Sequence, residues 1–177
     1  MPPVAVRVLE EDKDRGHQLT AEEVEAAAQI FWRFKLDMFK SELGAFIIRI
    51  TLGVLFFIHG LVKFQGGIEN IVGWFESIGL PGFMAYAVAL IELAGGLALI
   101  LGLATRLVSA LFAIIMIGAT LKIKLSIGLL GNGQMAGYEL DLALFAMAIY
   151  LAINGSNLLS AGQFIFHKDS SELKKAA

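Results

Sequence analysis

The sequence predicts an all-α protein, an integral membrane four-helix bundle preceded by an N-terminal amphipathic helix in the cytoplasm. Hydrophobic residues make up 57% of the 177 residues and charged residues 17%, and the mean hydropathy is +0.73. Soluble domains carry about 25% charged residues, so this composition indicates a membrane protein. Four apolar segments also approach the length of about 20 residues that a helix needs to cross a bilayer.

Residues 1–40 are interpreted as an N-terminal extension that contains the amphipathic helix. Thr20 and Glu23 have the spacing of a capping box, in which each side chain binds the backbone N–H of the other residue. The apolar residues that follow are separated by alternating steps of three and four, which places them on one helix face. They are Val24, Ala27, Phe31, Phe34 and Met38.

The predicted membrane domain covers residues 44–157 and contains the four apolar segments. These segments are residues 45–62, 82–103, 107 to about 130, and 138–153. Between the first two segments, Ile71, Trp74, Phe75 and Ile78 fall at helical spacing among glycines, which predicts a short helix at the outer interface. Paired and single glycines at 95–96 and 53 are interpreted as positions of close helix packing.

The distribution of lysine and arginine predicts that both termini lie in the cytoplasm. One side of the predicted membrane carries Arg33, Lys35, Lys40, Arg106, Lys168, Lys174 and Lys175, and the other carries Lys63, Lys122 and Lys124. Residues 158–177 are then a polar cytoplasmic tail. The first apolar run begins at residue 45 and has no cleavage pattern of a signal peptide, so we expect a multi-pass protein of the cell membrane.

Ionisable residues within or next to the apolar segments are the candidate functional residues, because a charge at membrane depth costs at least about 2.5 kcal/mol without a partner or a wet cavity. A rise of about 1.5 Å per residue places Arg49 roughly 6 Å from the cytoplasmic end, Glu92 roughly 16 Å, His59 roughly 21 Å and Lys122 roughly 22 Å. His59 and Glu92 therefore share a layer near the midplane. The side chain of Arg49 can rise toward Glu92 or extend to the interface.

A structural role remains open for each of these residues. Glu92 is either the buried counter-ion of Arg49 or a residue that touches ligand or protons. His59 is a packed, hydrogen-bonded histidine, a proton donor or ligand contact, or a haem ligand. Lys63, Lys124, Glu139 and Asp141 lie toward the outer end, where opposite charges can pair.

Several classes of function are excluded or left without a motif. The net charge of −2 and the absence of a basic run argue against nucleic-acid binding. The chain has no cysteine, which removes thiolate and iron–sulfur chemistry. We find no metal-ligand motif, no covalent cofactor motif, no P-loop and no dinucleotide-binding glycine fingerprint.

These motifs together resemble the DoxX family of four-helix membrane proteins. The resemblance rests on Arg49-Ile-Thr-Leu-Gly53, on Phe57-Ile-His-Gly60-Leu-Val-Lys63, on Ile91-Glu-Leu-Ala-Gly-Gly96 and on Tyr138-Glu-Leu-Asp141, with Gly102-Leu-Ala-Thr-Arg106 and Gly131-Asn-Gly-Gln between them. It covers roughly residues 44–154. Within the family, the chain is most similar to the CatD-type oxidoreductases of Gram-positive bacteria.

The resemblance implies a membrane subunit of a quinone-linked oxidoreductase system that protects against catechol and quinone electrophile stress. Because quinone reduction needs protons and His59 and Glu92 lie near the midplane, we expect these two residues to be catalytic. We expect a substrate site drawn from Arg49, Lys63, Lys122, Glu139 and Asp141. The expected ligand is a quinone or catechol-like molecule, and the electrons are expected from a soluble redox partner at the cytoplasmic face. A non-enzymatic membrane scaffold or an exporter of small aromatic molecules is the alternative.

Overall fold

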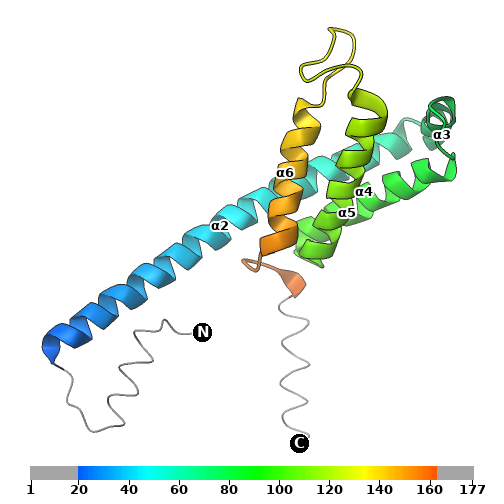
Figure 1. Ribbon diagram of the computed structural model, residues 1–177. Helices are drawn as coiled ribbons and strands as arrows, with labels where there is room; N and C mark the ends of the chain where they lie inside the picture. Colours follow the sequence, from blue (N-terminus) through cyan, green and yellow to red (C-terminus); the bar gives the residue numbers. More distant parts are fainter. Residues whose placement is uncertain (1–19, 163–177) are drawn as a thin grey trace, which may run out of the picture. The chain divides into compact units, whose positions relative to one another are not determined.

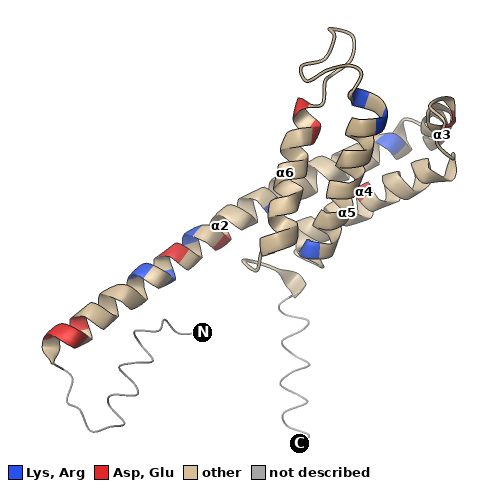
Figure 2. Cartoon of the chain, viewed as in Figure 1, with Lys and Arg blue, Asp and Glu red and all other residues tan. Residues whose placement is uncertain are grey.

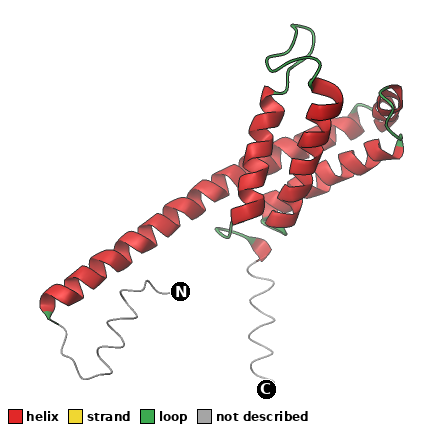
Figure 3. Cartoon of the chain, viewed as in Figure 1, coloured by secondary structure: helices red, strands yellow, loops and turns green. Residues whose placement is uncertain are grey.

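The computed structural model describes residues 20–162, and this part of the chain is helical without a strand (Figures 1 and 3). Its helices are α2 (Ala21–Gln65), α3 (Ile68–Ser77), α4 (Phe83–Leu101), α5 (Thr105–Ala119), the π-helical turn η1 (Thr120–Lys124) and α6 (Glu139–Asn154). The chain divides into two compact units, residues 1–44 and 45–177. Residues 163–177, which hold most of the predicted tail, lie outside the described part, as do residues 1–19.

The capping box at the start of α2 is confirmed. The Thr20 backbone N–H donates to Glu23 Oε2 at 2.8 Å, and the Glu23 backbone N–H donates to Thr20 Oγ1 at 3.3 Å. Each side chain thus satisfies one of the backbone donors that a helix N-terminus leaves without an intrahelical acceptor. The sequence therefore located the beginning of this helix correctly.

The amphipathic character expected for the helix before residue 44 is not confirmed. Phe31 and Phe34 on the predicted stripe are exposed, but so are Trp32, Leu36 and Phe39, which lie on other faces of the helix. No separate helix is formed either, because α2 is one element of 45 residues. Between residues 38 and 46 the sequence has no proline, and its single glycine, Gly44, is tolerated within a helix at a cost of about 1 kcal/mol.

Within residues 20–162, three helices are long and apolar enough to cross a membrane: α2, α4, and α5 continued by η1. The fourth predicted segment corresponds to α6, which has 16 residues and packs along α5 (Figure 1). Large apolar side chains such as Leu107, Ile114 and Leu121 on one face of this third helix are exposed. An exposed apolar face of this kind is expected where a helix meets lipid rather than water.

Glycines let α2 and α4 approach each other closely, as the sequence predicted for Gly53 and Gly96. A Cβ atom at Gly53 would lie 3.0 Å from the Gly96 carbonyl oxygen, and one at Gly60 would lie 2.5 Å from the Leu93 backbone nitrogen. The two helices run in opposite directions through this contact, since Gly53 faces Gly96 while Gly60 faces Leu93. Small residues at such positions permit backbone contact between membrane helices.

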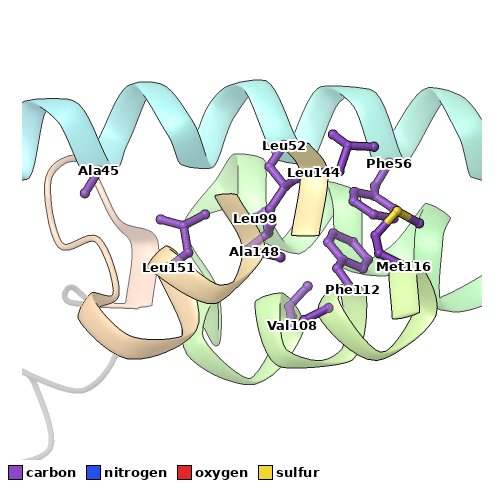
Figure 4. Close-up of a cluster of buried hydrophobic side chains, with 11 residues drawn as sticks. Ala45, Leu52, Phe56, Leu99, Val108, Phe112, Met116, Leu144, Ala148 and Leu151 are labelled. Carbon is purple, nitrogen blue, oxygen red and sulfur yellow. The ribbon is translucent and has the colours of Figure 1, made fainter. Parts of the chain in front are cut away.

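The buried apolar core lies where α2, α4, α5 and α6 converge (Figure 4). Phe56 of α2 stacks on Phe112 of α5 with ring centroids 3.7 Å apart. Leu99 of α4 and Leu151 of α6 are fully buried in the same cluster. This core fixes the positions of the charged residues that the helices carry.

The third apolar segment ends earlier than the sequence suggested. Its helical part stops at Lys124, not near residue 130, and its last turn is π-helical, with the Leu125 N–H donating to the Thr120 carbonyl at 2.8 Å. Gly128 and Gly131 beyond it adopt left-handed φ angles of 97° and 88°, which glycine reaches without steric cost. The sequence remains mostly apolar up to residue 130, but the backbone leaves the helix after Lys124.

Candidate functional site

An ion pair joins Lys63, near the end of α2, to Glu92 in the middle of α4. The Glu92 side chain is 5% exposed and the Lys63 side chain 23% exposed. The pair lies beside the contact between Gly60 and Leu93, so the close approach of the two helices brings the ammonium and the carboxylate together. Figure 2 shows that α4 and the second half of α2, which carry this pair, have few charged residues.

Arg49 does not pair with Glu92, although the sequence had left this pairing open. Its guanidinium extends in the other direction, where Nη1 donates to the Ser156 carbonyl at 3.1 Å and Nη2 donates to the Leu159 carbonyl at 3.2 Å. The Arg49 side chain is fully buried. Arginine can bind two carbonyls at once because its donors form a rigid planar fork.

The segment after α6 is therefore tied to the other helices by several hydrogen bonds. Ser160 Oγ donates to the Gly102 carbonyl at 2.6 Å, and Arg106 Nη2 donates to the carbonyl of Asn154, the last residue of α6, at 3.3 Å. Leu159 has a left-handed φ of 50°, a conformation that costs a non-glycine residue about 1 kcal/mol or more and persists only where neighbours hold it. We call this set of hydrogen bonds, made by Arg49, Arg106 and Ser160, the C-terminal clasp.

A hollow of about 540 Å³ lies beside the C-terminal clasp, lined in part by Thr105, Arg106 and Ser156. The side chains of Arg106 and Ser156 already make hydrogen bonds within the clasp. We attribute this hollow to incomplete packing where the ends of α4, α5 and α6 meet.

A second ion pair lies at the other end of the helices. Lys124 Nζ, in η1, is 2.8 Å from Asp141 Oδ1 in the first turn of α6. Asp141 is buried at 5% exposure. The π-helical turn inserts one extra residue into the helical repeat, which changes the direction in which Lys124 leaves the helix and is a feature often found at functional sites.

A smaller cavity of about 210 Å³ adjoins this second ion pair. Met116, Thr120, Tyr138, Asp141 and Phe145 line it from α5, η1 and α6, and Ile117, Leu121 and Leu142 complete its wall. Asp141 Oδ2 is buried and has no hydrogen-bond partner among the described residues. The lining of this cavity is therefore almost entirely apolar, and the Asp141 Oδ2 atom is covered by the protein.

The remaining predicted site residues are not brought into these pairs. His59 lies on an exposed part of α2, and Lys122 and Glu139 are exposed at the same end of the bundle as Asp141. Of the seven candidates, the structure thus joins Lys63 to Glu92, and Asp141 to Lys124, and it assigns Arg49 to the C-terminal clasp. The functional roles predicted for His59, Lys122 and Glu139 stay predictions.

Two features of these sites were not found from the sequence. The carbonyls of Ser156 and Leu159 are invisible to residue-type patterns, because every residue has a carbonyl group. The available signal was the short run of small and polar residues at 154–157 after the last apolar segment. The cavity beside Asp141 was also missed, because its lining comes from residues that are apart in sequence.

Comparison with known proteins identifies the family. The DoxX family model matches residues 44–125. The chain is also 46% identical over 125 residues to a Bacillus subtilis (strain 168) protein named "Putative oxidoreductase CatD", covering 71% of this chain and 89% of that protein. The chain belongs to the DoxX family.

A second relative supports a lipid environment for this DoxX protein. It is the "Inner membrane protein YqjF" of Escherichia coli (strain K12), 38% identical over 73 residues, which cover 40% of this chain and 53% of the relative. No solved structure matches the chain. Membership of the family and the apolar helices together establish a membrane protein with transmembrane helices, related to a protein named as an oxidoreductase.

Proposed function

We propose that this DoxX protein is the membrane subunit of a quinone-linked oxidoreductase system that protects cells against catechol and quinone electrophiles. The observation that carries the proposal is the Lys63–Glu92 ion pair, which lies between two apolar helices. Ionisable residues are costly at membrane depth and mark ligand sites or proton paths there. The similarity to a protein named as an oxidoreductase supports a redox role.

Reduction of a quinone to a hydroquinone consumes two electrons and two protons. The protons can come from the chain, because the Lys63 ammonium and the Glu92 carboxyl group are suitable donors and acceptors. His59, four residues before Lys63, is proposed as a further proton donor at the lipid-facing surface. The electrons are proposed to come from a soluble partner that carries a flavin or a nicotinamide and docks at the cytoplasmic face.

We further propose a multi-pass arrangement in the cell membrane with four crossing helices and both termini in the cytoplasm. The surplus of lysine and arginine near residues 33–40 and at Arg106 supports this orientation. The antiparallel contact between α2 and α4 is consistent with it, because α4 then returns toward the side from which α2 entered. A soluble redox partner would meet the protein on that side.

A second candidate is a non-enzymatic scaffold or an exporter of small aromatic molecules. The C-terminal clasp favours it, because Arg49, a predicted substrate-binding residue, is engaged in holding the segment after α6. Both ion pairs also connect different helices and so can serve as structural links. In this case, the charges stabilise the bundle and no electron transfer takes place.

Gentle extraction from membranes separates the two candidates. The proposed function predicts that the purified full-length protein retains a quinone or another lipid-soluble aromatic molecule, or a soluble flavin or nicotinamide protein. The exporter predicts instead a protein without such companions that moves catechol across the membrane of proteoliposomes. Transport of catechol with no associated quinone and no redox partner would contradict the proposed function.

A further inference from the structure

The hollow left where the ends of α4, α5 and α6 meet has the dimensions of a ligand site. Its volume is about 540 Å³, within the range of about 300–1,000 Å³ that is usual for small-molecule sites in proteins. Among the described residues that line it, Arg106 carries the only charge, and the other side chains are neutral. This part of the lining contains no carboxylate, so the hollow favours an anion over a cation.

One wall of the hollow is the N-terminus of α5, a helix of 15 residues. Ala104, the residue before this helix, has no side-chain acceptor to cap it. The Val108 N–H donates to the Ala104 carbonyl at 3.0 Å. The N–H groups of Thr105, Arg106 and Leu107 precede this bond and have no acceptor within residues 20–162. Unpaired N–H groups and the positive end of the helix dipole together favour a phosphate group.

The Thr105 side chain is a second, independent indication of a ligand. Thr105 is only 8% exposed, and its hydroxyl group has no hydrogen-bond partner in the described part of the chain. Ser109, one turn later, also has an unpaired hydroxyl oxygen, but that oxygen is completely covered. Thr105 Oγ1 instead keeps accessible surface at the hollow that Thr105 lines. A ligand with an acceptor oxygen would satisfy this buried hydroxyl group, which is costly to leave unpaired.

Arg106 supplies the positive charge beside Thr105. One of its five N–H donors is used by the Asn154 carbonyl, which lies 3.3 Å from Nη2. Arg106 is exposed, and no other hydrogen bond or ion pair engages it in the described part of the chain. A guanidinium that is anchored through one nitrogen can direct its remaining donors at the oxygens of a phosphate group.

The surroundings of the hollow favour a phospholipid over a free phosphate ion. Leu107 lines the hollow and is 65% exposed. Ile114, two turns further along α5, is also 65% exposed. Acyl chains can lie along this apolar face while the phosphate group enters the hollow. The headgroup layers of a bilayer lie on both sides of its hydrocarbon core, and the end of a helix that crosses the core lies in one of them.

We infer that this hollow binds the phosphate group of an anionic phospholipid, which is held by the Thr105 hydroxyl group, the Arg106 guanidinium and the first N–H groups of α5. The described lining has no carboxylate for the ammonium of a choline or ethanolamine headgroup, so a headgroup without a cation is preferred. A bound lipid would connect α5 to the segment after α6, because Gly155 and Ser156 line the same hollow. The site lies apart from the Lys63–Glu92 pair and does not depend on the redox role proposed above.

The test is binding of phosphatidylglycerol, phosphatidylcholine and inorganic phosphate to the purified full-length protein, measured by native mass spectrometry from detergent. Phosphatidylcholine has the same phosphate and acyl chains but adds a cation. The first phosphatidylglycerol molecule should bind about fivefold or more tightly than the first phosphatidylcholine molecule, because the net charge of the lipid meets an arginine. Equal binding of the two lipids would overturn the inference. Displacement of phosphatidylglycerol by an equal concentration of inorganic phosphate would also overturn it, because the ligand would then be the free ion.

Two variants test the location of the site. Arg106→Gln should weaken phosphatidylglycerol binding about tenfold or more, whereas Arg33→Gln, at an exposed position of α2, should leave it unchanged. Because Arg106→Gln also removes a hydrogen bond of the C-terminal clasp, Thr105→Val provides a second variant that keeps this bond and the shape of the side chain. It should also weaken binding about tenfold, while Thr51→Val, at an exposed position, should not.

The Thr105→Val variant also separates lipid binding from a structural role of the hydroxyl group. Its unfolding temperature in lipid-free detergent should equal that of the wild type, because the hydroxyl group has no protein partner to lose. A lower unfolding temperature would show that the hydroxyl group serves the fold and would contradict the inference. Unchanged phosphatidylglycerol binding in folded Thr105→Val and Arg106→Gln proteins would place the lipid elsewhere and overturn it.

Discussion

Lys63 and Glu92 form an ion pair beside a close contact of α2 and α4, although Glu92 lies in the middle of its helix and Lys63 near the end of its own. The pair is unequally buried, because Glu92 is almost fully covered while a quarter of the Lys63 side chain is open. Lysine can also move its ammonium group toward the interface along its flexible stem. Glu92 therefore needs Lys63 to compensate its buried charge more than Lys63 needs Glu92.

This asymmetry predicts unequal effects of the two single substitutions. Lys63→Met leaves a buried carboxylate without its partner and should lower the free energy of unfolding by about 3 kcal/mol. Glu92→Leu leaves a lysine that can reach the interface and should cost about 1 kcal/mol. The double variant should recover most of the loss. Thermal unfolding in detergent measures all three, and equal losses in the single variants would contradict the asymmetry.

The C-terminal clasp predicts that Arg49 is a structural residue. Arg49→Met removes the hydrogen bonds to the Ser156 and Leu159 carbonyls and should cost about 3 kcal/mol or more, because each bond to a charged donor is worth about 1.5–3 kcal/mol. Arg49→Lys should recover only part of this, since one ammonium cannot reproduce the fork.

Arg33→Met, at an exposed position, serves as the control for the Arg49 variants. It removes an arginine from the same helix without touching the C-terminal clasp. Limited proteolysis should cut the segment after α6 faster in Arg49→Met protein than in Arg33→Met protein. Equal cleavage rates and equal unfolding temperatures would show that the clasp does not hold this segment.

How far the sequence predicted these sites can be judged from particular residues. The capping box at Thr20 and the packing role of Gly53 and Gly96 followed from short motifs whose geometry is local or whose steric requirement is simple. The partner of Arg49 did not follow, because a long side chain can point toward either end of its helix. Depth along the helices likewise put His59 near Glu92, but depth does not determine which neighbour covers a given face.

The helix ends show a second limit of prediction from the sequence. Residues 125–130 are mostly apolar, so hydropathy extends the third segment through them, whereas the backbone leaves the helix after Lys124. The π-helical turn that directs Lys124 toward Asp141 has no sequence motif. The cavity beside Asp141 depends on this turn and therefore could not be predicted either.

The close contact between α2 and α4 predicts opposite effects for two glycine substitutions. A Cβ at Gly60 would lie 2.5 Å from the Leu93 backbone nitrogen, so Gly60→Ala must separate the helices and should cost about 1–3 kcal/mol. Gly118→Ala in α5 meets nothing within 4 Å and should be neutral or stabilise by up to about 1 kcal/mol. Thermal unfolding in detergent compares the two, and a stable Gly60→Ala protein would contradict the packing.

The proposed orientation predicts which single cysteines can be labelled from each side of the membrane. The chain has no cysteine, so each introduced thiol is the only target. Cysteine at Ser41 or Asn157 should react only with reagent supplied from the cytoplasm, and cysteine at Gln65 or Gln134 should react with impermeant reagent supplied from outside. All four positions are exposed. External labelling of Asn157→Cys would reverse the proposed topology.

The central claim is that the Lys63–Glu92 pair serves proton or ligand chemistry as well as helix packing, and protection of cells tests it most directly. Cells that depend on this protein should be challenged with catechol and with a methyl-benzoquinone, and survival compared between wild type, Glu92→Gln and the exposed control Glu25→Gln at equal membrane levels. Glu92→Gln keeps the size and one acceptor oxygen of the side chain but removes its ionisable group. We predict loss of protection in Glu92→Gln alone, whereas full protection by an inserted Glu92→Gln protein would contradict the claim and leave the pair with a structural role.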